Sequence, residues 1–207
     1  MVNLRTYIIL DSLQLQMASY LSSISRGYLP VAGQASCVIE IAPGIEINTL
    51  TDIALKTTAV TPGMQVVERA YGMLEFHSNS QGDTRTAGQA VLKAIQKKEE
   101  DRIKPRILTS QLIKNVEDHH AQLINRTRYG MMLLRGDTLY VLEIEPAGYA
   151  YYAANEAEKA ARINIIDVAG VGKYGRIYIG GEEAEVLECK KIVEKRLLEI
   201  IGREDYR

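Results

Sequence analysis

The side chains that could do chemistry in this sequence are a glutamate–arginine pair, three histidines and two cysteines. Glu68 and Arg69 stand side by side in the stretch QVVERAYGMLEF, between two valines and a short apolar run. In an extended chain successive side chains point to opposite faces, so adjacent opposite charges neutralise each other poorly. On spacing alone, the pair is typical of a surface ion pair that precedes a strand.

The histidines and cysteines do not form a catalytic or metal-binding set in the sequence. His119 and His120 are adjacent on an expected helix, so they point about 100° apart and cannot easily share a metal ion. Cys37 lies in an apolar strand with no base near it in the sequence. No GxSxG, P-loop or GxGxxG stretch is present, and GVGKYG lacks the strand-turn-helix context of a phosphate site. We therefore expect no enzyme, no metal site and no cofactor.

The composition is that of an ordinary globular protein. The chain is 46% hydrophobic and 25% charged, with a formal net charge of −1. This charge does not favour a general nucleic-acid binder or a membrane-surface binder. No apolar run approaches the roughly 18 residues of a membrane span, and Cys37 and Cys189 do not make a disulfide framework. We expect a cytoplasmic protein with buried thiols.

A repeat of about 103 residues organises the chain. Between residues 27 and 72, ten positions are identical to the position 103 residues later, where chance gives about three. Several of the pairs are glycines or prolines, which fix the backbone geometry at the edges of apolar runs. The identical pairs are Gly27/Gly130, Gly33/Gly136, Val38/Val141, Glu40/Glu143, Ile41/Ile144, Pro43/Pro146, Ala54/Ala157, Lys56/Lys159, Tyr71/Tyr174 and Gly72/Gly175.

Each half is expected to be an α+β unit of order β-α-β-β-α-β-α, with one more strand near residues 31–34 or 134–137. The charged, proline-containing bridge KKEEDRIKPR places the join near residue 100, which gives domains 1–100 and 101–207. The expected strands are 5–10, 37–44, 73–76, 105–110, 140–148 and 176–179. The expected helices are 12–25, 51–58, 84–98, 111–124, 154–161 and 182–201.

Two repeated charges stand out within these elements. Glu40 and Glu143 alternate with apolar residues on equivalent strands, so we expect a structural role at a sheet or subunit surface. Lys56 and Lys159 recur on equivalent helices. A lysine on a helix is usually a solvated side chain, and its repetition makes a lateral contact worth considering.

The stretches TDIALKTTAVTPGMQVVERAYG and ANEAEKAARINIIDVAGVGKYG resemble the signature of the bacterial microcompartment shell domain. The order of elements resembles the circularly permuted, ferredoxin-like form of that domain. Two such copies in one chain are similar to the tandem-domain trimeric shell proteins, and further stretches such as LPVAGQ, INRTRYG and GGEEAE are similar to those of carboxysomes. The resemblance covers nearly the whole chain.

The resemblance implies a pseudohexameric trimer that tiles into a shell beside hexameric and pentameric shell proteins, and rings that stack as a dimer of trimers. It implies a gated central pore that passes small phosphorylated metabolites such as RuBP and 3-phosphoglycerate. The gate maps onto Glu68 and Arg69, which the second copy lacks. The site residues implied besides the gate are a secondary pore loop of Gly170, Val171, Gly172 and Lys173 and tile-edge contacts at Lys56 and Lys159.

Two other functions compete with the shell interpretation. A small-molecule-binding regulator built of tandem ferredoxin-like halves would bind an effector between subunits and would not tile. An enzyme of unknown reaction is the weaker alternative, because the sequence offers no nucleophile–base pair and no metal set. Two-dimensional sheets would distinguish the shell protein from both.

Overall fold

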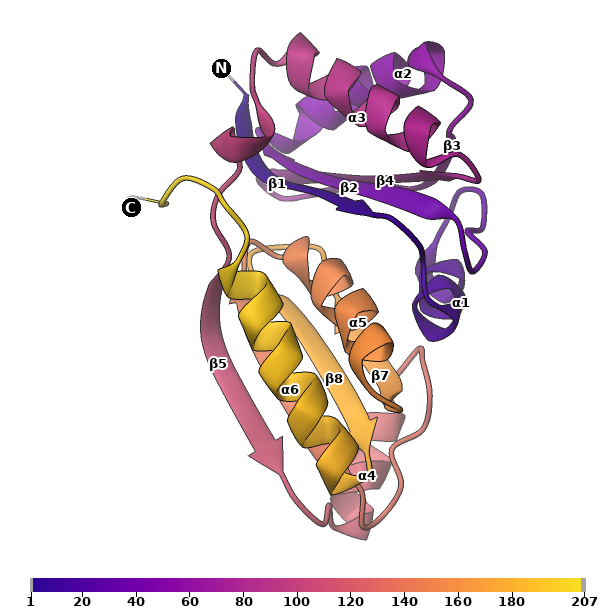
Figure 1. Cartoon of the computed structure of the whole chain (residues 1–207), viewed down its shortest axis with the longest axis vertical. Helices are drawn as coiled ribbons and strands as arrows, with labels where there is room; N and C mark the ends of the chain where they lie inside the picture. Colours follow the sequence, from indigo (N-terminus) through magenta and orange to yellow (C-terminus); the bar gives the residue numbers. More distant parts are fainter. Residues whose placement is uncertain (1, 206–207) are drawn as a thin grey trace.

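The computed structural model describes residues 2–205 and contains two four-stranded antiparallel sheets, one from each half of the chain (Figure 1). The first half contains β1 (Asn3–Leu10), α1 (Leu15–Ile24), β2 (Ala35–Ala42), α2 (Ile47–Thr57), β3 (Thr61–Glu68), β4 (Tyr71–Ser78) and α3 (Gln81–Ala94). The second half contains β5 (Arg106–Ile113), α4 (Asp118–Asn125), β6 (Thr138–Glu145), α5 (Tyr149–Ala160), β7 (Asn164–Ala169), β8 (Gly175–Gly181) and α6 (Glu183–Leu198). The strand orders β1-β2-β4-β3 and β5-β6-β8-β7 correspond, so both halves are α+β units of one topology.

The order of elements within each half differs from the expected one. Both halves run β-α-β-α-β-β-α, because the two consecutive strands follow the second helix and do not precede it. Residues 31–34 and 134–137 form turns, not strands, since Gly33 and Gly136 adopt φ angles of 89° and 87°. The fourth strand of each sheet is β3 or β7.

The expected helix over residues 111–124 is wrong in its first half. Gln111 pairs with Val141 and Ile113 pairs with Leu139, so β5 continues to Ile113 and the helix α4 begins only at Asp118. Cross-strand pairing thus overrides the helical periodicity of this stretch. The remaining expected helices are confirmed with shifted ends.

Helix ends follow the local sequence. The Ser80 hydroxyl accepts a hydrogen bond from the Asp83 backbone N–H and caps α3. Helix α6 begins with Glu183 and Glu185 and ends with Lys195 and Arg196, charges that complement its dipole.

The loops repeat as faithfully as the strands. The Gly27 N–H donates to the Gly63 carbonyl over 2.9 Å, and the Gly130 N–H donates to the Ile166 carbonyl over the same distance. Both acceptors sit at irregularities in the strand register, between Pro62 and Met64 in β3 and at the matching place in β7. The offset of 103 residues therefore holds in three dimensions and allows positions in one half to be compared with positions in the other.

The first sheet is covered on one face by its own helices and on the other by both halves. Helices α2 and α3 pack over Cys37, Ile39 and Phe76, and Figure 1 shows them above the sheet. The opposite face, with Val38 and Met73, belongs to a core that α1 and the second-half helix α5 complete. The largest core of the chain is thus shared by the two halves.

A buried carboxylate joins the halves at this shared core. Glu40 accepts hydrogen bonds from Arg5 Nε at 2.8 Å, from Thr6 Oγ1 at 3.1 Å and from the backbone N–H of Gly148 at 3.1 Å. Arg5 also lies 3.8 Å from the centre of the Tyr71 ring. Burial raises the pKa of Glu40, and the Arg5 guanidinium opposes that rise. The expected surface position of Glu40 is therefore wrong, because the second half covers it.

Replacing Glu40 with glutamine should destabilise the protein strongly, because Arg5 would remain buried without a carboxylate. We expect the free energy of unfolding to fall by about 3 kcal/mol, measured by urea denaturation at fixed protein concentration. The matched control is Glu183→Gln, which removes an exposed partner of Lys114 and should change stability by less than about 1 kcal/mol. Equal effects of the two substitutions would contradict the assignment.

Candidate functional site

The Glu68–Arg69 pair lies at the tip of the β3–β4 hairpin. Glu68 is the last residue of β3 and pairs with Tyr71, which leaves Arg69 and Ala70 as a two-residue turn. Arg69 adopts a φ of 52°, in the left-handed region that glycine normally occupies. This conformation costs an ordinary residue roughly 1–2 kcal/mol. Such outliers concentrate at functional sites, so the turn is a candidate on backbone grounds as well as on charge.

The turn brings the two charges closer than an extended strand would. The distance between Arg69 Nε and Glu68 Oε1 is 3.6 Å, and the side chains are 93% and 50% exposed. An exposed pair at this separation contributes at most about 1 kcal/mol. Both groups can therefore exchange each other for an outside partner at little cost.

The matching loop of the second half is longer and uncharged at the equivalent positions. Five residues, 170–174, connect β7 to β8. Gly172 stands at the position of Arg69 and adopts a φ of 110° with open space around it. Lys173 Nζ lies 4.9 Å from the centre of the Tyr174 ring. The two tips thus share a residue with a positive φ angle, which is glycine in one copy and arginine in the other.

Gly170 is not a flexible part of that loop. It is buried, and a Cβ atom at this position would lie 2.3 Å from the ring of the fully buried Tyr151. Close packing therefore explains this glycine. Val171 also packs against the core, whereas Gly172 has open space around it and Lys173 is exposed.

One hollow of about 650 Å³ brings parts of both tips together. Glu68 lines it from β3, and Gly170 and Val171 line it from the end of β7. One wall is fixed by Tyr20, whose hydroxyl donates a 2.9 Å hydrogen bond to Asp167 and lies 2.9 Å from the Val168 carbonyl. Arg69 and Lys173 do not line the hollow and project from the tips.

Lys56 and Lys159 occupy the last turns of the equivalent helices α2 and α5. Lys56 Nζ lies 2.6 Å from an oxygen of Asp52, and both side chains are more than half exposed. Lys159 Nζ lies 2.7 Å from an oxygen of Glu156 and is 36% exposed. Both ammonium groups are thus held at helix ends by a carboxylate of the same helix.

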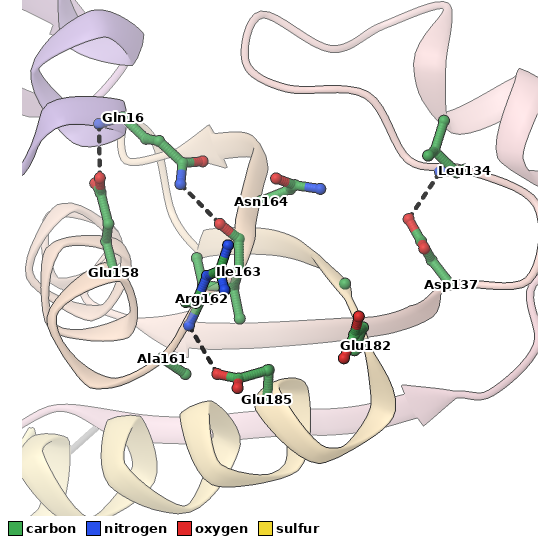
Figure 2. Close-up of a pocket in the computed structure, with 11 residues that line it drawn as sticks. Gln16, Leu134, Asp137, Glu158, Ala161, Arg162, Ile163, Asn164, Glu182 and Glu185 are labelled. Atoms are coloured by element: carbon green, nitrogen blue, oxygen red, sulfur yellow. Dashed lines mark hydrogen bonds between the residues drawn. The ribbon is translucent and has the colours of Figure 1, made fainter.

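A second hollow, of about 550 Å³, lies where α1 meets the end of α5 and the start of α6 (Figure 2). Glu158 reaches from α5 and accepts from the backbone N–H groups of Gln16 and Met17 at 2.8 and 2.9 Å. Glu185 and Asp137 likewise accept backbone N–H groups, of Arg162 and Leu134. Three of the four carboxylates that line this hollow therefore hold backbone N–H groups, and the fourth is Glu182.

Sequence reasoning missed the Glu158 cap because the two partners are 142 residues apart for the Gln16 bond. The repeat carries a signal for it, since the equivalent of Glu158 is Leu55. A carboxylate in only one copy of a repeated helix marks a contact that the other copy lacks.

The cysteines are separate and buried, and the described residues hold no metal-binding cluster. Both cysteines are buried and unpaired, and burial raises the pKa of Cys189 to about 12 and that of Cys37 well above its usual value. Among residues 2–205, no group of three His, Cys, Asp or Glu side chains could hold a metal ion. Over the same residues, every helix is too short or too polar to span a bilayer.

Comparison with known proteins agrees with this architecture. Residues 4–101 match the family described as the CsoS1D N-terminal domain. The carboxysome shell protein CcmP of Synechococcus elongatus is 53% identical over 203 residues, which cover 98% of this chain and 95% of that protein. The carboxysome shell protein CsoS1D of Hydrogenovibrio crunogenus is 45% identical over 98% of this chain and 100% of its own length.

Two solved structures share the fold over the whole length. The double ringed trimeric shell protein MSM0271 from the RMM microcompartment is 38% identical, with a TM-score of 0.96 over 99% of this chain and 100% of that chain. The fused permuted hexameric shell protein MSM0275 from the same microcompartment is 41% identical, with a TM-score of 0.94 over 98% and 100%. The chain therefore belongs to the carboxysome shell protein family that includes CcmP and CsoS1D, whose members are structural shell components and not enzymes.

Proposed function

We propose that three copies of the chain close into a pseudohexagonal ring that tiles the carboxysome shell, each copy contributing domains 1–100 and 101–207. The two halves share one topology, so three chains supply six equivalent units. Each half has one face that the other half covers and one face that is free. The free face of each half is equivalent, at the offset of 103 residues, to the covered face of the other half. The same contact can then be made once within each chain and once between neighbouring chains.

The observation that carries this proposal is the character of the free faces. A shift of 103 residues moves several residues that line the half–half contact onto exposed apolar positions. Leu123 is 60% exposed and Ile45 is 66% exposed, and such side chains in groups mark interaction surfaces. The exposed counterparts are Leu123, Ile45, Leu55 and Val67, in place of Tyr20, Gly148, Glu158 and Gly170.

The proposed ring has a gated pore formed by the hairpin tips. Three copies of Glu68 and Arg69 and three copies of residues 171–173 would surround the axis. Arginines that face the axis would attract anions, including small phosphorylated metabolites such as RuBP and 3-phosphoglycerate. Arginines that instead pair with Glu68 of a neighbouring chain would close the opening through charge-assisted hydrogen bonds. The strained turn at Arg69 supports two arrangements of similar energy.

A second repeated surface supports stacking of two rings. The turn that follows α1 exposes Tyr28, Leu29 and Val31, and the turn that follows α4 exposes their counterparts Met131, Met132 and Leu134. A ring would carry these apolar turns six times on one side. The double ringed relative supports a second ring as the partner that covers them.

Alanine at both Glu68 and Arg69 should abolish pore closure and leave the ring intact, because the closing hydrogen bonds are lost and no core residue changes. Cryo-electron microscopy of the purified rings would sort open and closed particles. The control is Asp11→Ala with Arg85→Ala, another exposed ion pair away from the tip. A closed class as populated as in the wild type would refute the gate.

Lys56→Ala should weaken lateral assembly, because it removes the expected tile-edge contact. Rings should persist, because Lys56 is exposed at a helix end and contributes to no core. Negative-stain electron microscopy of two-dimensional sheets would measure assembly, and native mass spectrometry would measure the ring. Lys93→Ala, at the exposed end of α3, is the matched control. Sheets of unchanged size and order in the Lys56 variant would count against an edge role.

Leu29→Glu combined with Met132→Glu should halve the mass of the stacked particle, because both apolar turns become negatively charged. Sedimentation velocity would separate single from double rings. Leu198→Glu, which places the same charge on the exposed surface of α6, should leave stacking unchanged. Double rings that survive the paired substitution would show that another surface joins them.

A further inference from the structure

At the start of α1, hydrogen bonds join this helix of the first half to the second half. The Gln16 side chain donates to the Ile163 carbonyl over 2.7 Å and accepts from the Ile165 N–H over 2.8 Å. Figure 2 shows Gln16 directed at Ile163, beside the Glu158 carboxylate that caps the same helix. One amide side chain thus satisfies both a carbonyl and an N–H at the start of β7.

The equivalent contact between neighbouring chains has different chemistry on both sides. His119 stands at the position of Gln16, Val60 at that of Ile163 and Pro62 at that of Ile165. Proline has no N–H, so the neighbouring chain offers an acceptor at Val60 and no donor. The side chain that contacts this surface therefore needs only to donate a hydrogen bond, whereas Gln16 both donates one and accepts one.

His119 meets that requirement in its protonated form. Its Nδ1 lies 3.0 Å from Glu117 Oε1, and its ring is 85% exposed in the single chain. The imidazolium donates from both nitrogens, to Glu117 and to an acceptor beyond. The neutral ring has one N–H, so it would turn a lone pair either towards the carboxylate or towards the neighbouring carbonyl. The hydrogen bond to Glu117 already raises the pKa of His119 in the single chain.

We propose, on the basis of the proposed ring, that His119 is a proton-dependent contact between protomers. The imidazolium Nε2–H of one chain donates to the Val60 carbonyl oxygen of the next chain, while Nδ1–H remains on Glu117. Each interface then takes up a proton from solvent when the ring closes. The partner is a second copy of this chain.

The charges around this contact favour the imidazolium. On its own chain, Glu117 and Asp118 lie at the start of α4, and His120 follows His119 on the same helix. Arg135 lines a surface hollow together with Glu117, Asp118 and His119. On the neighbouring α2, the equivalent positions bring Asp52, which is paired with Lys56.

At the other positions equivalent to the surroundings of Gln16, the neighbouring α2 and the start of β3 carry no ionisable side chain. Leu55 replaces Glu158 and Ala59 replaces Arg162, while β3 begins with Thr61. Carboxylates therefore outnumber the permanent cations around the His119 imidazole.

The direction of the pH effect follows from linkage. His119 gains an acceptor in the ring, so its pKa is higher in the ring than in the free chain. The contact is complete below the pKa of the free chain and is lost as the pH rises through the pKa in the ring. Between these values each contact should weaken by up to about tenfold per pH unit.

The test is ring dissociation measured from pH 5.5 to 9 by mass photometry on dilution, with the urea midpoint of dissociation as the second readout. Wild-type rings should weaken as the pH rises. His119→Gln supplies a donor that does not titrate, as Gln16 does, so its rings should lose that part of the pH dependence. His119→Ala should weaken rings at low pH, and His120→Gln should retain the wild-type profile.

The outcomes separate this contact from the ring itself. Rings whose pH profile is the same in the wild type and in His119→Gln would overturn the contact and leave the proposed function standing. Chains that form no ring at any pH would overturn both.

Discussion

The face of the first sheet that α2 and α3 leave open has to be buried, and the rest of the molecule is arranged around that requirement. Helix α5 of the second half and helix α1 cover this face and form the largest core with it. The cover also encloses Glu40, which is balanced only because Arg5, Thr6 and the Gly148 N–H all reach it. The two halves are therefore fixed relative to each other by packing and by one satisfied buried charge.

In the proposed ring the repeat would make the same contact once within each chain and once between chains, and the two versions differ in a physically consistent way. Within the chain the contact adds polar bonds to the shared apolar core, since Glu158 caps α1 and Tyr20 bonds Asp167. On the free faces Leu55 and Leu123 replace Glu158 and Tyr20, and α4 is capped by its own Glu117. A helix that meets its partner only after association has to satisfy its own N–H groups first. The proposed interface between chains would then rely on apolar area, which needs no exact partner geometry.

The sequence predicts the architecture well where information is local or repeated, and poorly where it depends on distant partners. The 103-residue repeat and the glycine and proline positions predict two equal α+β units, and the structure has them. The helical pattern of residues 111–113 misleads because β6 pairs with this stretch. The resemblance assigns Gly170 to a pore loop, and in the structure the Tyr151 ring packs against it. The burial of Glu40 could not be predicted from the sequence, because Gly148, which covers it, lies 108 positions away.

The β3–β4 hairpin tip depends both on local sequence and on distant partners. Its charges are local and readable, and Tyr71 and Gly72 repeat as Tyr174 and Gly175 while Glu68 and Arg69 do not. The left-handed turn costs Arg69 roughly 1–2 kcal/mol, and the exposed ion pair returns at most about 1 kcal/mol. The pair therefore cannot hold the tip in one conformation by itself. What the tip meets at the centre of the proposed ring has to decide its conformation, and only there do three copies of the same two charges come within reach of one another.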